Sequence, residues 1–385
     1  MLSFLKKYLF PLLFGCSSIT AQATIMFNPI YDDVNNNTGI GFDDPTIVGP
    51  NGLTLGQQRQ DTLQGVFKYI NTVINENGTF NLEVGSLSTS SPSTPSNSDN
   101  IIAGQPPLVY SSLSMDNTPT NDILAQGGAN YLIQNGFNNS FPSIHITTGD
   151  NPCGEGNSLC PGVPSDVTIP DATIQFNFDQ NWNSSLDAPA FDQYDLFTVA
   201  LHEIAHDLGF DSFISETGAS IYADQYGINA YTTYDSHLVL GDGTPLIPLI
   251  NSAGIFDVSP SALTSNNVFF SGEHANAANG GNPIQVYAPS TWEQGSSLVH
   301  LNNPSDLMYY LIYPGTEKRT FSDVDLGILQ DLGYNLHSAN NGGNGGDNGS
   351  GGQTPPSNVP EPSSLALFLL GSIFIYSRRN LYSVI

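Results

Sequence analysis

Residues 201–210 read Leu201-His202-Glu203-Ile204-Ala205-His206-Asp207-Leu208-Gly209-Phe210 and contain two histidines four positions apart. Histidines four residues apart lie one above the other on one face of a helix, close enough to bind one metal ion. Glu203 stands beside the first histidine, where a carboxylate can take a proton from a water molecule at the metal. The pattern H-E-x-x-H therefore predicts hydrolysis at a zinc ion.

The flanking residues predict a helix that begins after Asp195 and ends at Gly209. Its apolar residues recur at helical spacing: Leu196, Val199, Ala200, Ile204 and Leu208. Aspartate satisfies free backbone N–H groups at a helix start, and glycine often ends a helix in a left-handed conformation. The alternative is a buried helix whose histidines are ordinary hydrogen-bonded core residues. The agreement of helix, glutamate and glycine favours the metal.

A catalytic zinc ion usually takes three protein ligands, so a third one is needed. In the compact H-E-x-x-H-x-x-G-x-x-H pattern it follows the glycine by three residues, where this chain has Ser212, a poor zinc ligand. The carboxylate of Glu216 is one alternative. The other histidines lie in a predicted strand, in polar loops or at the edge of the tail: His145, His237, His274 and His337. His300 is preferred because of the sequence that follows it.

The sequence after His300 resembles the leishmanolysin-type metzincins, and the likeness extends over roughly residues 195–335. In that family a long insertion displaces the third zinc histidine, which a methionine turn follows, and then a helix ending in Q-D-L-G-[FY]. Here His300, Met308 and Gln330–Tyr334 occur in that order. Ser322 and Asp325 form a capping-box pattern at the start of the last helix. The chain departs from the family in a tighter His300-to-Met308 spacing and in lacking its cysteine-rich parts.

The resemblance implies an α+β fold of the metzincin-like zinc peptidases, with a twisted mixed sheet, long helices, a zinc helix and a Met-turn. It implies that His202, His206 and His300 are zinc ligands and that Glu203 is the general base. Met308 would be the Met-turn residue, an apolar floor to the site. Tyr310 is a weak candidate for stabilising the oxyanion, and ordinary packing is the favoured alternative for it.

Two further elements are expected between the ends of the chain. The spacing of apolar residues from Leu63 to Ile74 predicts an amphipathic helix. Residues 171–178 alternate like a strand, with Ile174, Phe176 and Phe178 on one face. In metzincins an edge strand before the zinc helix pairs with the extended peptide substrate. We therefore expect an edge strand here, with a plain interior strand as an equal alternative.

The ends of the chain predict export. Residues 1–23 have a basic start, an apolar core and the small-x-small end Ala21-Gln22-Ala23, as in a signal peptide that signal peptidase removes. Lipidation at Cys16 is a minor alternative. Residues 24–338 would form the metallopeptidase domain, with 210–299 as an insertion between the zinc ligands. A glycine-, asparagine- and proline-rich linker spans 339–358.

Residues 359–385 resemble the PEP-CTERM tails of Gram-negative bacteria. They contain Pro360-Glu361-Pro362, a short apolar run and Arg378-Arg379. The resemblance implies an exosortase-type partner, a transient inner-membrane transmembrane helix, and delivery to the cell envelope or extracellular matrix. The alternative is a permanent anchor.

Cysteine content and charge agree with export. Cys153 and Cys160 predict a disulfide that closes a small loop, and a cysteine switch at the zinc is a weaker reading. Residues 24–358 contain only four basic residues against 34 acidic ones, a formal balance of −30. Such a surface repels nucleic acid, so no nucleic-acid partner is expected. Calcium could bind the acidic residues of 32–44, but no calcium-binding motif supports this.

The predicted function is that of an exported zinc endopeptidase acting on peptide or protein substrates. A non-catalytic envelope or matrix adhesion protein on a metallopeptidase fold is the alternative, and a zinc-dependent amidase is a third possibility. The intact Glu203 favours catalysis, since a binding scaffold has no need of a base beside the metal.

Overall fold

The computed structural model describes residues 24–87, 124–129, 170–221, 231–247 and 260–337. The chain divides into a unit Met1–Ser338, which holds all of these residues, and a unit Ala339–Ile385. The predicted signal segment, the Cys153–Cys160 disulfide, His145 and the C-terminal segment lie outside the described residues. Within them, no helix combines the length and apolar character needed to cross a membrane.

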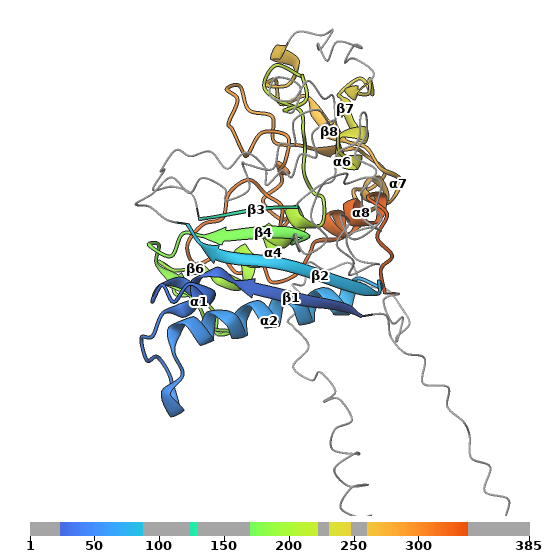
Figure 1. Ribbon diagram of the computed structural model, residues 1–385. Helices are drawn as coiled ribbons and strands as arrows, with labels where there is room; N and C mark the ends of the chain where they lie inside the picture. The colour runs from blue at the N-terminus through green and yellow to red at the C-terminus, as the bar shows by residue number, and fades with distance from the viewer. Residues whose placement is uncertain (1–23, 88–123, 130–169, 222–230, 248–259, 338–385) are drawn as a thin grey trace, which may run out of the picture. The chain divides into compact units, whose positions relative to one another are not determined.

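The N-terminal half of the described residues contains a four-stranded mixed sheet (Figure 1). Its order is β1 (Ile25–Tyr31), β2 (Gly78–Ser86), β4 (Ala172–Phe176) and β3 (Ala125–Ala129). Strands β1, β2 and β4 are parallel, whereas β3 is antiparallel to β4. The combination of this sheet with several helices confirms the predicted α+β class.

The strand at residues 171–178 is not the edge strand that was expected, and the alternative of an interior strand is confirmed. Strand β4 pairs with β2 on one side and with β3 on the other, so residues 171–178 form an interior strand. Ile174 and Phe176 are buried on one face, while Thr173 donates a hydrogen bond to Glu83 on the other. Alternation reports which faces are buried, and it carries no information about whether an edge is paired. Among the described residues the sheet ends at β1 on one side and at β3 on the other, and β3 is the end strand in contact with α4.

One face of the sheet packs against α2 (Leu55–Val73), the helix predicted from the apolar spacing at 63–74. Its buried apolar residues are Leu63, Val66, Phe67 and Ile70. Opposite them, the alternate residues Phe80, Leu82 and Val84 of β2 are fully buried. Phe27 of β1 stacks on Phe67, with ring centroids 4.4 Å apart. A capping box of Thr54 and Gln57 begins the helix.

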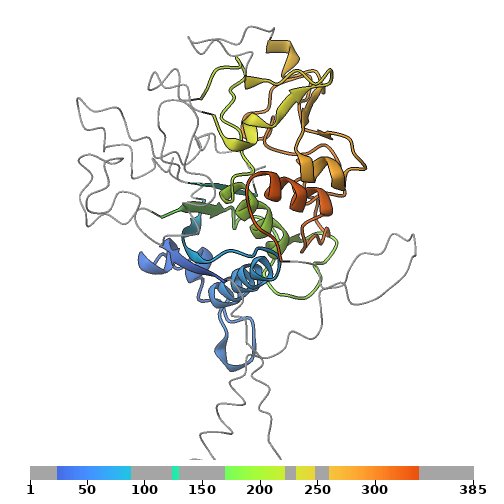
Figure 2. The same ribbon diagram turned by 90° about the vertical axis from the view of Figure 1, so that its right-hand side faces the viewer.

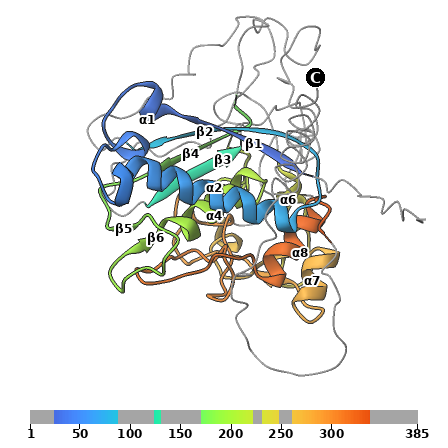
Figure 3. The same cartoon turned by 90° about the horizontal axis from the view of Figure 1, so that it is seen from below.

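The helix α4 (Leu196–Asp207), which carries the H-E-x-x-H motif, lies beside α2 on the same side of the sheet (Figure 3). Every residue of α4 is buried. Asp195 caps its start as predicted, accepting the Thr198 N–H at 3.1 Å. Arg319 holds the same carboxylate with two hydrogen bonds, at 2.9 and 2.7 Å. Gly209 ends the helix at φ +97°, a left-handed conformation that glycine adopts without strain.

Short elements join these larger ones. Those between β1 and α2 are α1 (Asp32–Asn35), η1 (Gly41–Asp43) and η2 (Pro50–Gly52), and β5 (Trp182–Asn183) pairs with β6 (Tyr194–Asp195) just before α4. The acidic residues considered for calcium contact protein groups here. Asp33 accepts hydrogen bonds from the Phe42 N–H and the Ser86 hydroxyl, and Asp44 pairs with Arg59 at 3.6 Å.

The C-terminal half contains a second, antiparallel sheet of β7 (Leu238–Leu240), β8 (Val268–Phe270) and β9 (Ile284–Gln285). Around it lie α6 (Thr233–Ser236), η4 (Pro260–Ala262), α7 (Glu273–Ala278) and α8 (Asp323–Asp331). Helices α7 and α8, orange and red in Figure 2, touch where Gly327 leaves no room for a side chain against Ala275. The predicted capping box of Ser322 and Asp325 begins α8.

Candidate metal centre

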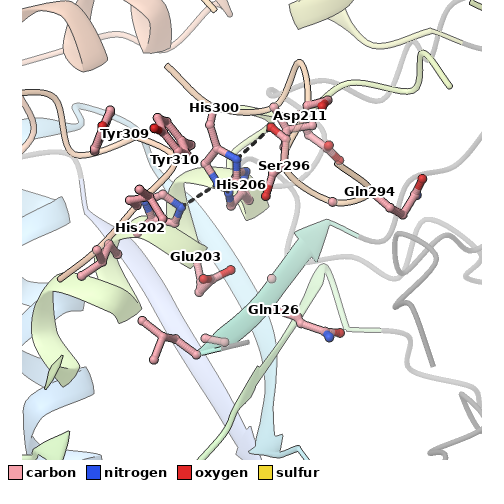
Figure 4. A pocket seen from close by; sticks show the side chains of 18 of the residues that line it. Gln126, His202, Glu203, His206, Asp211, Gln294, Ser296, His300, Tyr309 and Tyr310 are labelled. Atoms are coloured by element: carbon pink, nitrogen blue, oxygen red, sulfur yellow. Dashed lines mark hydrogen bonds between the residues drawn. The ribbon is translucent and has the colours of Figure 1, made fainter. Parts of the chain in front are cut away.

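The described residues bring together three histidines, which we call the histidine cluster: His202, His206 and His300 (Figure 4). The Nε2 atom of His300 lies 3.1 Å from Nε2 of His202 and 3.3 Å from Nε2 of His206. All three side chains are buried, with exposed fractions of 4%, 6% and 8% in chain order. The residues proposed from distant parts of the sequence thus converge on one point.

The other ring nitrogen of each histidine is held by a backbone carbonyl. The Nδ1 atom of His202 donates to the carbonyl of Leu307 at 3.0 Å. In the same way, Nδ1 of His206 donates to the carbonyl of Phe210 at 2.7 Å, and Nδ1 of His300 donates to the carbonyl of Ser296 at 3.1 Å. A carbonyl oxygen only accepts, so each Nδ1 must carry the proton. Each Nε2 of a neutral ring then presents a lone pair to the other two.

Three lone pairs with no hydrogen between them repel one another, and a cation removes that repulsion. Four-coordinate zinc with Zn–N bonds of about 2.0–2.1 Å places neighbouring nitrogens about 3.3–3.4 Å apart. The spacings of 3.1 and 3.3 Å within the histidine cluster are close to that value. Nδ1–H groups donating to carbonyls are also the usual support of metal-binding histidines. The donor set therefore fits a zinc ion.

Burial keeps the cluster uncharged. It lowers the pKa of His206 to about 4, that of His300 to about 3 and that of His202 well below the usual histidine value. The neighbouring rings lower the pKa of His202 and His300 further, because two imidazolium ions so close together repel each other. Neutral imidazole is the form that binds a metal ion.

Glu203 lies between the histidine cluster and β3 (Figure 4). Burial raises the pKa of its carboxyl group to about 8, and a hydrogen bond from the backbone N–H of Gly127 in β3 opposes this rise. The contact is tight: a Cβ added to Gly127 would lie 2.9 Å from the Glu203 Cβ and carbonyl oxygen and 3.0 Å from its Oε2. A glycine in β3 is what lets the strand approach Glu203 this closely.

The turn at Met308 lies beside the cluster. Met308 is fully buried, and its carbonyl accepts the N–H of Leu301, the residue after His300, at 2.7 Å. The carbonyl of Leu307, in the same turn, accepts the hydrogen bond from Nδ1 of His202. The turn therefore accepts a hydrogen bond from the side chain of His202 and another from the backbone of the residue next to His300.

A cleft of about 540 Å³ opens over these groups. Besides the histidine cluster and Glu203 it is lined by residues of β3 and by the segment after the turn, together with Tyr194 and Trp292. Tyr310 lines the cleft, and its ring stacks on Tyr287 with centroids 3.7 Å apart and planes 7° apart. That stack agrees with the packing reading of Tyr310, and its oxyanion role stays a prediction.

The remaining candidate ligands lie elsewhere. His237 stacks on Phe270 of β8, and His274 is exposed at the start of α7. Glu216 is exposed in a turn, so the ligand helix that a glutamate ligand would require does not form there. Ser212 and Asp211 line the cleft next to the cluster, but neither belongs to the group of converging metal-binding atoms among the described residues.

Two parts of the site were missed from the sequence. Strand β3 is only five residues long and reads Ala-Gln-Gly-Gly-Ala, without the alternating apolar residues that predict a strand. Its glycine pair was the only available signal, since glycine in a strand often marks a close approach of another backbone. Asp325 also accepts hydrogen bonds from the N–H groups of Leu307 and Met308, and no sequence pattern indicated these contacts because the capping-box pattern already accounted for the residue.

One comparison with known proteins identifies part of the chain. The PEP-CTERM protein-sorting motif matches residues 358–380. No curated protein and no solved structure matches the chain significantly. The motif marks an exported protein of Gram-negative bacteria that carries a C-terminal anchor recognised by an exosortase-type enzyme. The match supports the predicted PEP-CTERM tail and implies recognition by an exosortase-type sorting enzyme.

Proposed function

We propose that the protein is an exported zinc-dependent endopeptidase of the metzincin type, similar to the leishmanolysins. One observation carries the proposal. Three buried histidines, each with Nδ1 held by a carbonyl, direct their Nε2 atoms to a common point beside Glu203, in an open cleft. Metal ligands, a base and access for a substrate are the parts that metal-assisted hydrolysis requires.

In this proposal His202, His206 and His300 bind the zinc ion, leaving one position open. When bound, zinc supplies Lewis-acid polarisation of a water molecule and of the scissile carbonyl. Glu203 takes the proton of the attacking water and later donates it to the leaving amine. The hydrogen bond from the backbone N–H of Gly127 holds the carboxyl group of Glu203 in position for both transfers.

Strand β3 supports an extended peptide as the substrate. Among the described residues its only strand partner is β4, so its other edge has no β partner. Residues Leu124, Ala125, Gln126 and Gly127 line the same cleft as the histidine cluster. A peptide that adds to this edge would be bound through backbone hydrogen bonds, which tolerate many side chains.

The metzincin assignment rests on the order of parts along the chain and on their contacts. The motif helix, the distant His300, the buried Met308 turn and the final helix α8 follow the family's order. His300 and Met308 are connected through Leu301. The long insertion expected between the second and third ligands would hold α6, α7 and the second sheet.

Zinc content and peptide cleavage by the purified protein test this function. We expect about one zinc ion per chain. Glu203→Gln should keep that zinc and lose about 10²- to 10⁴-fold in kcat, the range that a general base contributes. The exposed Glu216→Gln is the matched control and should cleave normally.

His300→Ala tests the third ligand. It should lose most of the zinc, whereas His274→Ala, at an exposed histidine, should keep it. Full zinc content in His300→Ala would contradict the ligand set. Zinc binding without cleavage of any peptide would favour the alternative of a non-catalytic adhesion protein.

A further inference from the structure

The carboxylate of Asp325, at the start of α8, reaches beyond its own helix. A capping box needs one of its oxygens, and Oδ2 accepts the Ser322 N–H at 2.8 Å for that purpose. The same Oδ2 also accepts the N–H of Leu307 at 2.8 Å, and Oδ1 accepts the N–H of Met308 at 3.4 Å. The side chain of Asp325 is fully buried. Two of its three backbone N–H donors come from the Met308 turn, and only one comes from its own helix start.

One peptide group connects this carboxylate to a histidine of the cluster. The peptide between Leu307 and Met308 donates its N–H to Asp325, and its carbonyl accepts the Nδ1–H of His202 at 3.0 Å. An anion at the N–H end of a peptide group polarises it and makes the carbonyl a better acceptor. The order is carboxylate, peptide, imidazole, and so resembles a carboxylate–histidine–zinc triad with a peptide group inserted.

The turn is clamped from its other side as well. The Lys318 ammonium group donates to the carbonyls of Pro304 and Asp306, the latter at 2.8 Å. The peptide between Asp306 and Leu307 therefore lies between an ammonium group at its carbonyl and a carboxylate at its N–H. Through the Met308 carbonyl and Leu301, the turn also supports the segment that carries His300.

We propose that Asp325 is a positioning residue of the metal centre: through the Leu307–Met308 peptide it orients His202 and strengthens it as a ligand. Asp325 touches neither metal nor substrate. The inference rests on the proposed function in that it takes the histidine cluster as the metal site. It adds that the affinity for the metal ion also depends on Asp325, a residue of α8 that lies outside the histidine cluster.

Metal affinity of the full chain, measured by competition with a chelator, tests the proposal. Asp325→Asn removes the charge and places an amide against at least one N–H donor of the turn. We expect zinc affinity to fall by about 10- to 100-fold, the usual effect of losing a partner of a metal-binding histidine. Asp323→Asn, an exposed aspartate in the same turn of α8, is the matched control and should bind zinc normally.

A spectroscopic readout separates positioning from general stability. With cobalt in place of zinc, Asp325→Asn should show shifted visible absorption bands, and Asp323→Asn should not. If Asp325→Asn does not fold, Asp325→Glu keeps the charge and should lose less than tenfold in affinity once folded.

The possible outcomes distinguish this inference from the proposed function. Asp325→Asn with zinc affinity within threefold of the unsubstituted protein and an unchanged cobalt spectrum overturns the positioning role alone. An Asp325→Glu protein that folds but binds zinc more than 100-fold more weakly also overturns it. Absence of zinc binding by the unsubstituted protein overturns the proposed function itself.

Discussion

The closeness of β3 to Glu203 gives a sharp prediction for Gly127→Ala. The new methyl group would lie 2.9 Å from two atoms of Glu203, and ordinary contact begins at 3.4 Å, so strand and base must separate by about 0.5 Å. Overpacking of this kind costs about 1–3 kcal/mol of stability. A misplacement of about 1 Å can cost about 100-fold in rate, so half that distance predicts a loss of about tenfold in kcat.

Peptide cleavage, zinc content and urea unfolding, measured on the same preparations, test this prediction. Zinc content should be unchanged, because the three atoms nearest to an added methyl group all belong to Glu203 and none to a histidine. Gly85→Ala is the matched control, since it adds a methyl group in strand β2 of the same sheet, where the nearest atom is an ordinary 3.5 Å away. If Gly127→Ala is as active and as stable as Gly85→Ala, β3 does not hold the base as described.

Three further predictions concern the helix cap, the metal and the tail. Arg319→Ala leaves the fully buried Asp195 carboxylate without its charge partner and should destabilise the protein by about 3–5 kcal/mol in urea unfolding; a cost no greater than that of the exposed Lys68→Ala would contradict this. Zinc at about 100 times its Kd should add about 2.7 kcal/mol to the unfolding free energy of chelator-treated protein, an increment that His300→Ala should lack. Deleting residues 358–385 should abolish association with the membrane fraction during export and leave zinc binding intact. Immunoblots of membrane fractions and metal analysis would measure these two results. Loss of zinc on deletion would mean that the tail contributes to the folded unit.

Local patterns explain which parts of the fold were predictable. The helices around 63–74 and 196–207 were found because apolar spacing and caps are properties of neighbouring residues. The edge strand was misplaced because strand order depends on pairing between distant segments. Strand β4 has the clearer alternation of apolar and polar residues, yet it is an interior strand because β3, which lacks that alternation, pairs with its other side.

The site divides in the same way. Helical periodicity alone places His202, Glu203 and His206 together, because four residues span about one turn. His300 was found from the order of motifs, but its distance from the other two histidines depends on how the Met308 turn packs. The approach of Gly127 to Glu203, and of Asp325 to the turn, joins residues separated by many positions and leaves no local pattern.

The sequence by itself therefore determined the H-E-x-x-H helix, its caps and the sorting tail, because each depends on contacts or signals within one short segment. Only the tertiary structure decided that β3 pairs with β4 and contacts α4, that the three Nε2 atoms meet, and that Asp325 holds the turn behind His202. These features depend on packing between distant segments, which many different local sequences can satisfy equally well.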